Sequence, residues 1–65
     1  MKIKVNRTTI EVYDGANVRH ALLKYFLKRQ LSAALITRAK VYDEMGHPID
    51  FDTPLSDGQI IKCKV

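Results

Sequence analysis

The sequence has a single cysteine, no tryptophan, three glycines and two prolines among 65 residues. A single cysteine cannot form the internal disulfides on which small secreted domains depend. It also cannot by itself hold a structural zinc or an iron–sulfur cluster, which need several ligands. No apolar run approaches the roughly 20 residues that cross a bilayer, and the first residues lack the apolar core of a signal peptide. The sequence therefore predicts a cytoplasmic protein with no membrane segment, metal or other cofactor.

Catalytic motifs are also absent. His20 and His47 have no serine, cysteine or acid at a spacing typical of a base and its nucleophile. Cys63 has the same parity as its apolar neighbours, and lysines occupy the positions between them. This pattern indicates that Cys63 is a small core residue. The sequence thus favours a protein that is not an enzyme.

The composition is that of a globular chain, with 46% hydrophobic and 28% charged residues. At this length we expect a single domain spanning residues 1–65. Basic residues exceed acidic ones by 11 to 7, and the resulting net charge of +4 favours acidic partners, including nucleic acid, without deciding between them.

Residues 1–13 alternate between apolar and polar side chains, a pattern that predicts a β-hairpin. If Asn6 and Arg7 form a two-residue turn, Ile3 lies opposite Ile10, and other apolar pairs share their face. A register shifted by one residue would lose this match. Arg7 is a poorer turn residue than glycine, so a wider turn is the alternative.

A helix is predicted to follow the hairpin. Asn17 is a suitable N-cap, because its side chain can accept a hydrogen bond from the first helical turn. From there apolar residues recur at helical spacing and form one stripe: Val18, Ala21, Leu22, Tyr25 and Phe26. No strong stop signal follows, so the helix is predicted to reach about Gln30.

A third strand is predicted over residues 36–42, with Arg38 and Lys40 on one face. After a turn, residues 47–49 favour a very short fourth strand, which Pro48 would confine to a sheet edge.

The last stretch alternates again: Ile61, Cys63 and Val65 are predicted to be interior, and Lys62 and Lys64 exterior. The predicted order is strand, strand, helix, strand, short strand, strand. This order favours an α+β fold with a mixed sheet of four to five strands packed on one helix.

That order resembles the ubiquitin-like β-grasp fold, in which the first and last strands lie parallel in the centre of the sheet. The stretch MKIKVNRTTIEVYDGANVRHAL is similar to the opening of TGS domains, sulfur-carrier proteins and plant-type ferredoxins. The stretch DTPLSDGQIIKCKV is similar to the closing turn and strand of TGS domains and sulfur carriers, although Gln59 stands where a second aspartate is usual.

Each relative implies a different function. Sulfur carriers need a C-terminal Gly-Gly, so this resemblance implies a carrier only if the chain, which ends in Lys62-Cys63-Lys64-Val65, is truncated before such a tail. Plant-type ferredoxins hold their cluster with cysteines after the helix, where residues 27–45 contain none. TGS domains occur in proteins that act on tRNA or nucleotides, which implies an RNA-binding module.

The hypothesis that follows is a non-catalytic β-grasp binding module, an adaptor or accessory subunit whose partner is an acidic protein. A TGS-like RNA-binding module is the alternative. The first candidate surface consists of the basic residues predicted on the outer face of the sheet: Lys2, Lys4, Arg38, Lys40, Lys62 and Lys64. Ordinary solvated surface is the competing interpretation.

A second candidate surface lies on the helix, where residues 17–30 contain no acid. Its basic members are Arg19, His20, Lys24 and Lys28. A second apolar line is formed by Leu23, Leu27 and Leu31. We expect this line to be buried within the domain; contact with a partner or with a second copy is the alternative, so a monomer or weak homodimer is predicted.

Overall fold

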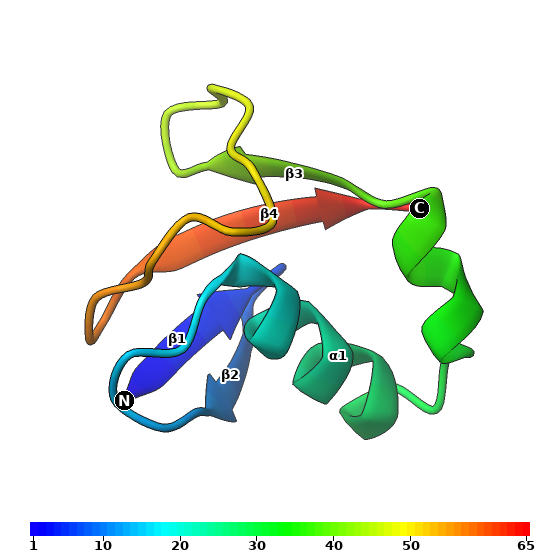
Figure 1. The fold of residues 1–65 in the computed structure, drawn as a ribbon, viewed down its shortest axis with the longest axis horizontal. Helices are drawn as coiled ribbons and strands as arrows, with labels where there is room; N and C mark the ends of the chain where they lie inside the picture. Colours follow the sequence, from blue (N-terminus) through cyan, green and yellow to red (C-terminus); the bar gives the residue numbers. More distant parts are fainter.

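The computed structural model describes residues 1–65 as a four-stranded mixed sheet covered on one face by an α-helix (Figure 1). The elements in chain order are β1 (Lys2–Val5), β2 (Thr8–Glu11), α1 (Val18–Lys28), the 3₁₀-helix η1 (Ala33–Thr37), β3 (Lys40–Asp43) and β4 (Ile60–Lys64). The sheet order is β2-β1-β4-β3, with β1 and β4 parallel in the centre and both outer pairs antiparallel. The predicted α+β class is confirmed. No helix has the length and apolar character needed to span a membrane.

The hairpin has the predicted register, with Ile3 opposite Ile10 and Lys2 opposite Glu11. Asn6 and Arg7 form the two-residue turn, and both have positive φ, at 49° and 72°. This is the backbone of a type I′ turn, whose twist matches that of the flanking strands. The alternating pattern was therefore sufficient to set the register, even though Arg7 is unfavourable in the turn.

Both ends of α1 are fixed by local hydrogen bonds. At its start the Asn17 side chain accepts from the N–H of His20, and His20 Nδ1 accepts from the N–H of Asn17. This reciprocal arrangement is a capping box. At the other end Gln30 has a φ of 56°, and the N–H of Leu31 donates to the C=O of Phe26 at 2.8 Å, as in a Schellman motif. The helix therefore ends at Lys28, two residues before the predicted boundary.

The prediction for the middle of the chain was partly wrong. Residues 33–37 form η1, so residues 36 and 37 are not the start of a strand, and β3 begins only at Lys40. Arg38 is the C-cap of η1, so it does not belong to the sheet. The predicted fourth strand is reduced to one isolated bridge between Tyr42 and Pro48. The two backbone bonds around this bridge are made by His47 and Ile49, and the chain leaves β3 after Ile49 toward the start of α1.

The core lies between α1 and the sheet, and all five residues of the predicted helix stripe are buried in it. Ile61 and Cys63 are buried as predicted, whereas Val65 is exposed and that prediction was wrong. The other buried side chains are Ile3, Val5, Ile10, Val12, Ala16, Val41 and Leu55. No buried side-chain nitrogen or oxygen lacks a hydrogen-bond partner. The core is therefore apolar and leaves polar groups for the surface.

Candidate interaction surface

Five lysines share the face of the sheet that is turned away from α1. Along β1 and β4 the buried residues alternate with exposed lysines, and β3 adds another exposed lysine beside its buried Val41. Because β1 pairs with β4 and β4 pairs with β3, these side chains lie on three adjacent strands. We call this set the lysine face: Lys2, Lys4, Lys40, Lys62 and Lys64.

The lysine face has little internal compensation of charge. Lys40 lies directly opposite Lys64 in the β3–β4 ladder. None of the five ammonium groups takes part in a salt bridge or a hydrogen bond. The acid in register with the face is Glu11, opposite Lys2. Like charges in directly opposite positions destabilise a sheet. An anionic group bound to this face would reduce the repulsion between its lysines.

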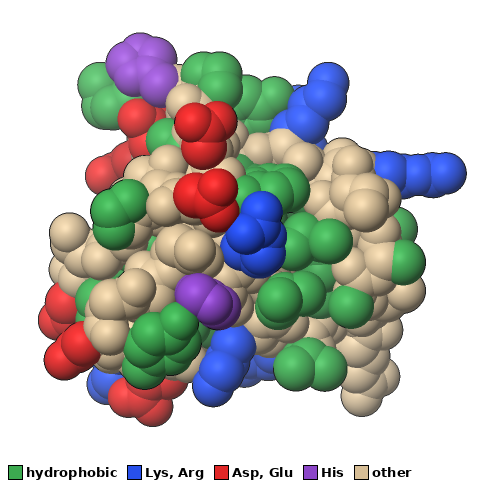
Figure 2. Space-filling view, viewed as in Figure 1, with side chains coloured by type: hydrophobic (Ala, Val, Ile, Leu, Met, Phe, Trp, Pro, Cys, Tyr) green, Lys and Arg blue, Asp and Glu red, His purple; other side chains and the backbone are tan.

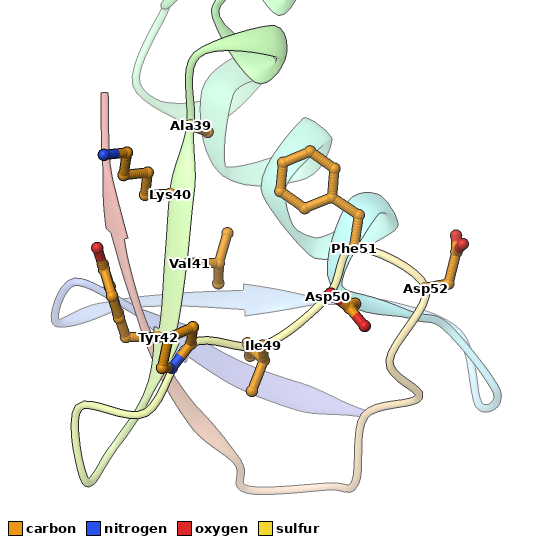
Figure 3. A pocket seen from close by; sticks show the side chains of 9 residues that line it. Ala39, Lys40, Val41, Tyr42, Ile49, Asp50, Phe51 and Asp52 are labelled. Carbon is orange, nitrogen blue, oxygen red and sulfur yellow. The ribbon is translucent and has the colours of Figure 1, made fainter.

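An aromatic side chain also lies on this face. Tyr42 is opposite Lys62 in the β3–β4 ladder and is half-buried. In Figure 3 Tyr42 and Lys40 extend to the same side of β3, and Val41 extends to the other. Tyr42 has the same parity as Lys40, a member of the predicted basic surface, so alternation along the strand places both on one face. Arg38, which was included, lies before β3.

The predicted basic surface on the helix is largely engaged within the domain. Arg19 forms an ion pair of 2.9 Å with Asp52 and lies over the Phe51 ring, 5.8 Å from its centroid. His20 belongs to the capping box, and its ring nitrogens lie 3.1 Å from the Tyr13 hydroxyl. Lys28 Nζ donates to the C=O of Thr9 at 2.9 Å.

Lys24 is the one member of the predicted helix surface whose side chain makes none of these bonds. On the face seen in Figure 2 the Lys and Arg side chains are dispersed among apolar and acidic ones and form no continuous basic area. Most side chains of the predicted helix surface therefore bond to other parts of the domain.

The three leucines of the second apolar line have different environments. Leu23 is half-buried, Leu27 is 76% exposed, and Leu31 lies beyond the end of α1 with 37% exposure. The expectation that the domain buries this whole line was wrong. Leu27 lies beside Lys24 and Lys28 on the outside of the domain, where no other segment covers it.

A groove of about 510 Å³ runs along the outer edge of β3 (Figure 3). One wall consists of residues 39–42, that is, Ala39 and the first three residues of β3. The other wall consists of residues 48–52. The backbone of the second wall is held in place because the N–H of Arg19 donates to the C=O of Phe51. Ile49 and Phe51 are half-buried and line the groove. The sequence pattern did not predict this groove, because it depends on how residues 48–52 pack beside β3.

Cys63 is a core residue, as its parity predicted. Its side chain is buried, and burial raises the pKa of the thiol above its usual 9.0, because the thiolate would lose its hydration. A thiol in this state is a poor nucleophile at neutral pH. No group of three or more histidine, cysteine, aspartate or glutamate side chains lies close enough together to hold a metal ion.

No protein-family model matches the chain, and no curated protein matches it. The lysine face and the groove are therefore the features of the molecule that bear on its function.

Proposed function

We propose that this chain is a non-catalytic binding module with a ubiquitin-like β-grasp fold. Three features of the sheet support the β-grasp assignment: the chain opens with a hairpin, one helix covers one face, and β1 and β4 are parallel neighbours in the centre. A sheet covered on one side only leaves its other face available for contact with a partner.

The proposed partner is a protein with an acidic patch, and the lysine face is the proposed contact. The observation that supports this choice is the pairing of Lys40 with Lys64, two exposed like charges in register without a counter-ion. Carboxylates brought between them would replace repulsion by charge-assisted hydrogen bonds. The face also spans three adjacent strands, β1, β4 and β3, which suits contact with another protein surface.

RNA is the second candidate partner, and the position of Tyr42 supports it. An aromatic ring beside Lys40 and opposite Lys62 combines a stacking platform with cations that can contact phosphate. Both candidate partners would contact the lysines, but only RNA binding would also use Tyr42.

The test compares binding to polyglutamate and to bulk tRNA by fluorescence anisotropy as the salt concentration rises. The variant Lys62→Glu/Lys64→Glu reverses two charges on the lysine face. The matched control, Lys24→Glu/Arg29→Glu, reverses two exposed charges on the helix side and changes the net charge equally, from +4 to 0. Because counterion release drives such binding, affinity for either polyanion should fall by about tenfold or more between low and physiological salt.

An acidic-protein partner predicts that polyglutamate binds, that Lys62→Glu/Lys64→Glu abolishes binding, and that the control retains most of it. An RNA partner predicts tighter binding of tRNA and a further loss in Tyr42→Leu. Absence of binding to both probes at low salt, or equal losses in the two double variants, would contradict the use of the lysine face.

A further inference from the structure

The backbone of Val41 is turned away from its neighbouring strand. Val41 lies opposite Cys63, but the N–H and C=O of Cys63 both bond to the side chain of Asn6 on the β1 side. In an antiparallel ladder the hydrogen-bonding groups alternate between the two edges of a strand. The N–H and C=O of Val41 therefore point to the outer edge of β3, where the C=O accepts from the N–H of Ile49 at 3.0 Å.

The outer edge of β3 is only half covered by the chain itself. Residues 47–49 pair with its second half, through the bond from Ile49 and another from the N–H of Asp43 to the C=O of His47. The chain then leaves the edge toward the start of α1. Along the first half the N–H of Val41 and the C=O of Ala39 have no backbone partner. This donor and this acceptor have the spacing that an added strand needs for pairing.

The groove described above lies on this uncovered half of the edge. Its inner side is apolar, with Val41, Ile49 and Phe51 around it in Figure 3. Its outer side is formed by Lys40 and Tyr42, which belong to the face of the sheet that carries the lysines. An added strand would direct alternate side chains to these two sides.

The charges around the groove indicate which side chains such an added strand would carry. On the outer side Lys40 and, across the ladder, Lys64 have no counter-ion. Asp50 and Asp52 lie at the far wall, and Asp52 is already paired with Arg19 at 2.9 Å. A second copy of this chain would bring more cations to the same place. An acidic segment is therefore favoured on the outer side, and an apolar residue on the inner side.

We propose that the outer edge of β3 binds an extended segment of the partner protein in which apolar and acidic residues alternate. Its backbone pairs with Val41 N–H and Ala39 C=O, one apolar side chain enters the groove beside Phe51, and the flanking carboxylates reach Lys40 and Lys64. The choice of acidic residues rests on the proposed function, whereas the pairing with the edge does not.

The test uses a capped peptide of about seven residues that alternates glutamate and valine. Two versions each carry one backbone N-methyl group, on adjacent central residues. Successive N–H groups of a strand point to opposite edges, so only one of the two methyl groups faces β3. We expect the peptide to slow hydrogen exchange of the Val41 amide and one methylated peptide to bind at least about tenfold more weakly than the other. Lys40→Glu should weaken binding, and Lys24→Glu should not.

The outcomes separate this inference from the proposed function. If both methylated peptides bind alike, or if amide shifts centre on β2 or α1, edge pairing is wrong even where polyglutamate still binds the lysine face. If the peptide and polyglutamate both fail to bind, edge pairing and the acidic-protein partner are both wrong, and only tRNA binding would still support the lysine face. A peptide with lysine in place of glutamate that binds equally well would overturn the predicted acidic character while edge pairing stood.

Discussion

The side chain of Asn6 binds the backbone of Cys63 as a neighbouring strand would. Its Nδ2 donates to the C=O of Cys63 at 2.8 Å, and its Oδ1 accepts from the N–H of Cys63 at 2.9 Å. The backbone of β1 pairs with β4 only as far as Ile61, where the N–H of Asn6 donates to the C=O at 3.2 Å. The chain then turns into the hairpin, and the asparagine amide continues the ladder that β1 has left.

Replacement of Asn6 by alanine should destabilise the fold by about 2–4 kcal/mol. Each lost hydrogen bond contributes about 1 kcal/mol, and leaving partly buried backbone groups unpaired adds to that. The positive φ of 49° adds strain for a residue with a Cβ that lacks the polar side chain of asparagine. Urea denaturation measures the loss.

Two further variants separate these causes. Asn6→Gly keeps the backbone freedom and removes the amide, so it should recover about 1 kcal/mol relative to alanine. Asn6→Asp keeps an acceptor for the N–H of Cys63 and cannot donate to its C=O, so it should be intermediate. Equal stability of the wild type and Asn6→Gly would show that the two bonds to Cys63 contribute nothing.

Arg7→Gly should stabilise the hairpin by about 0.5–1 kcal/mol. Arg7 has a φ of 72° in the type I′ turn, a conformation that glycine adopts without a Cβ penalty. Arg7→Ala removes the charge and keeps the Cβ, so it should not be stabilising. Thermal unfolding of the three proteins at one pH measures the difference. A rise in melting temperature for alanine equal to that for glycine would assign the effect to charge instead.

Leu22 and Leu27 lie on the same helix and should respond differently to the same substitution. Leu22 is fully buried, so Leu22→Ala should cost about 2–5 kcal/mol through lost burial and a cavity. Leu27 is 76% exposed, so Leu27→Ala should change the free energy of unfolding by less than about 0.5 kcal/mol. Sedimentation at high concentration completes the comparison. A large cost for Leu27→Ala that grows with protein concentration would reveal a contact between two copies.

The buried thiol predicts a loss of stability in alkali. Burial raises the pKa of Cys63 above its usual 9.0, so the folded state favours the protonated thiol. Its contribution is fully present below about pH 9 and is lost as the pH rises through the raised value. The difference in unfolding free energy between the wild type and Cys63→Val should therefore shift against the wild type above pH 9. Lysines titrate in both proteins and cancel in this difference; a constant difference up to pH 11 would contradict the prediction.

The elements that the sequence predicted well are those governed by local patterns. The hairpin register follows from alternation, since a slip by one residue would expose Ile3 and Ile10. The start of α1 follows from Asn17, a local cap. The end of α1 was missed because Gln30, rather than glycine, adopts the left-handed conformation. The start of the third strand, predicted at residue 36, was wrong because short apolar runs occur in helical turns as well as in strands.

The candidate site also has some features that could be predicted from the sequence and others that could not. The exposed lysines of β1 and β4 could be predicted, because side chains alternate along a strand wherever one face is buried. Their assembly into one face required the parallel pairing of β1 with β4, a contact between the two ends of the chain. The bonds of Asn6 to Cys63 and the uncovered edge at Val41 depend on that same pairing. Periodicity is a property of neighbouring residues and is visible in the sequence, whereas pairing between distant strands is decided only when the whole core is packed.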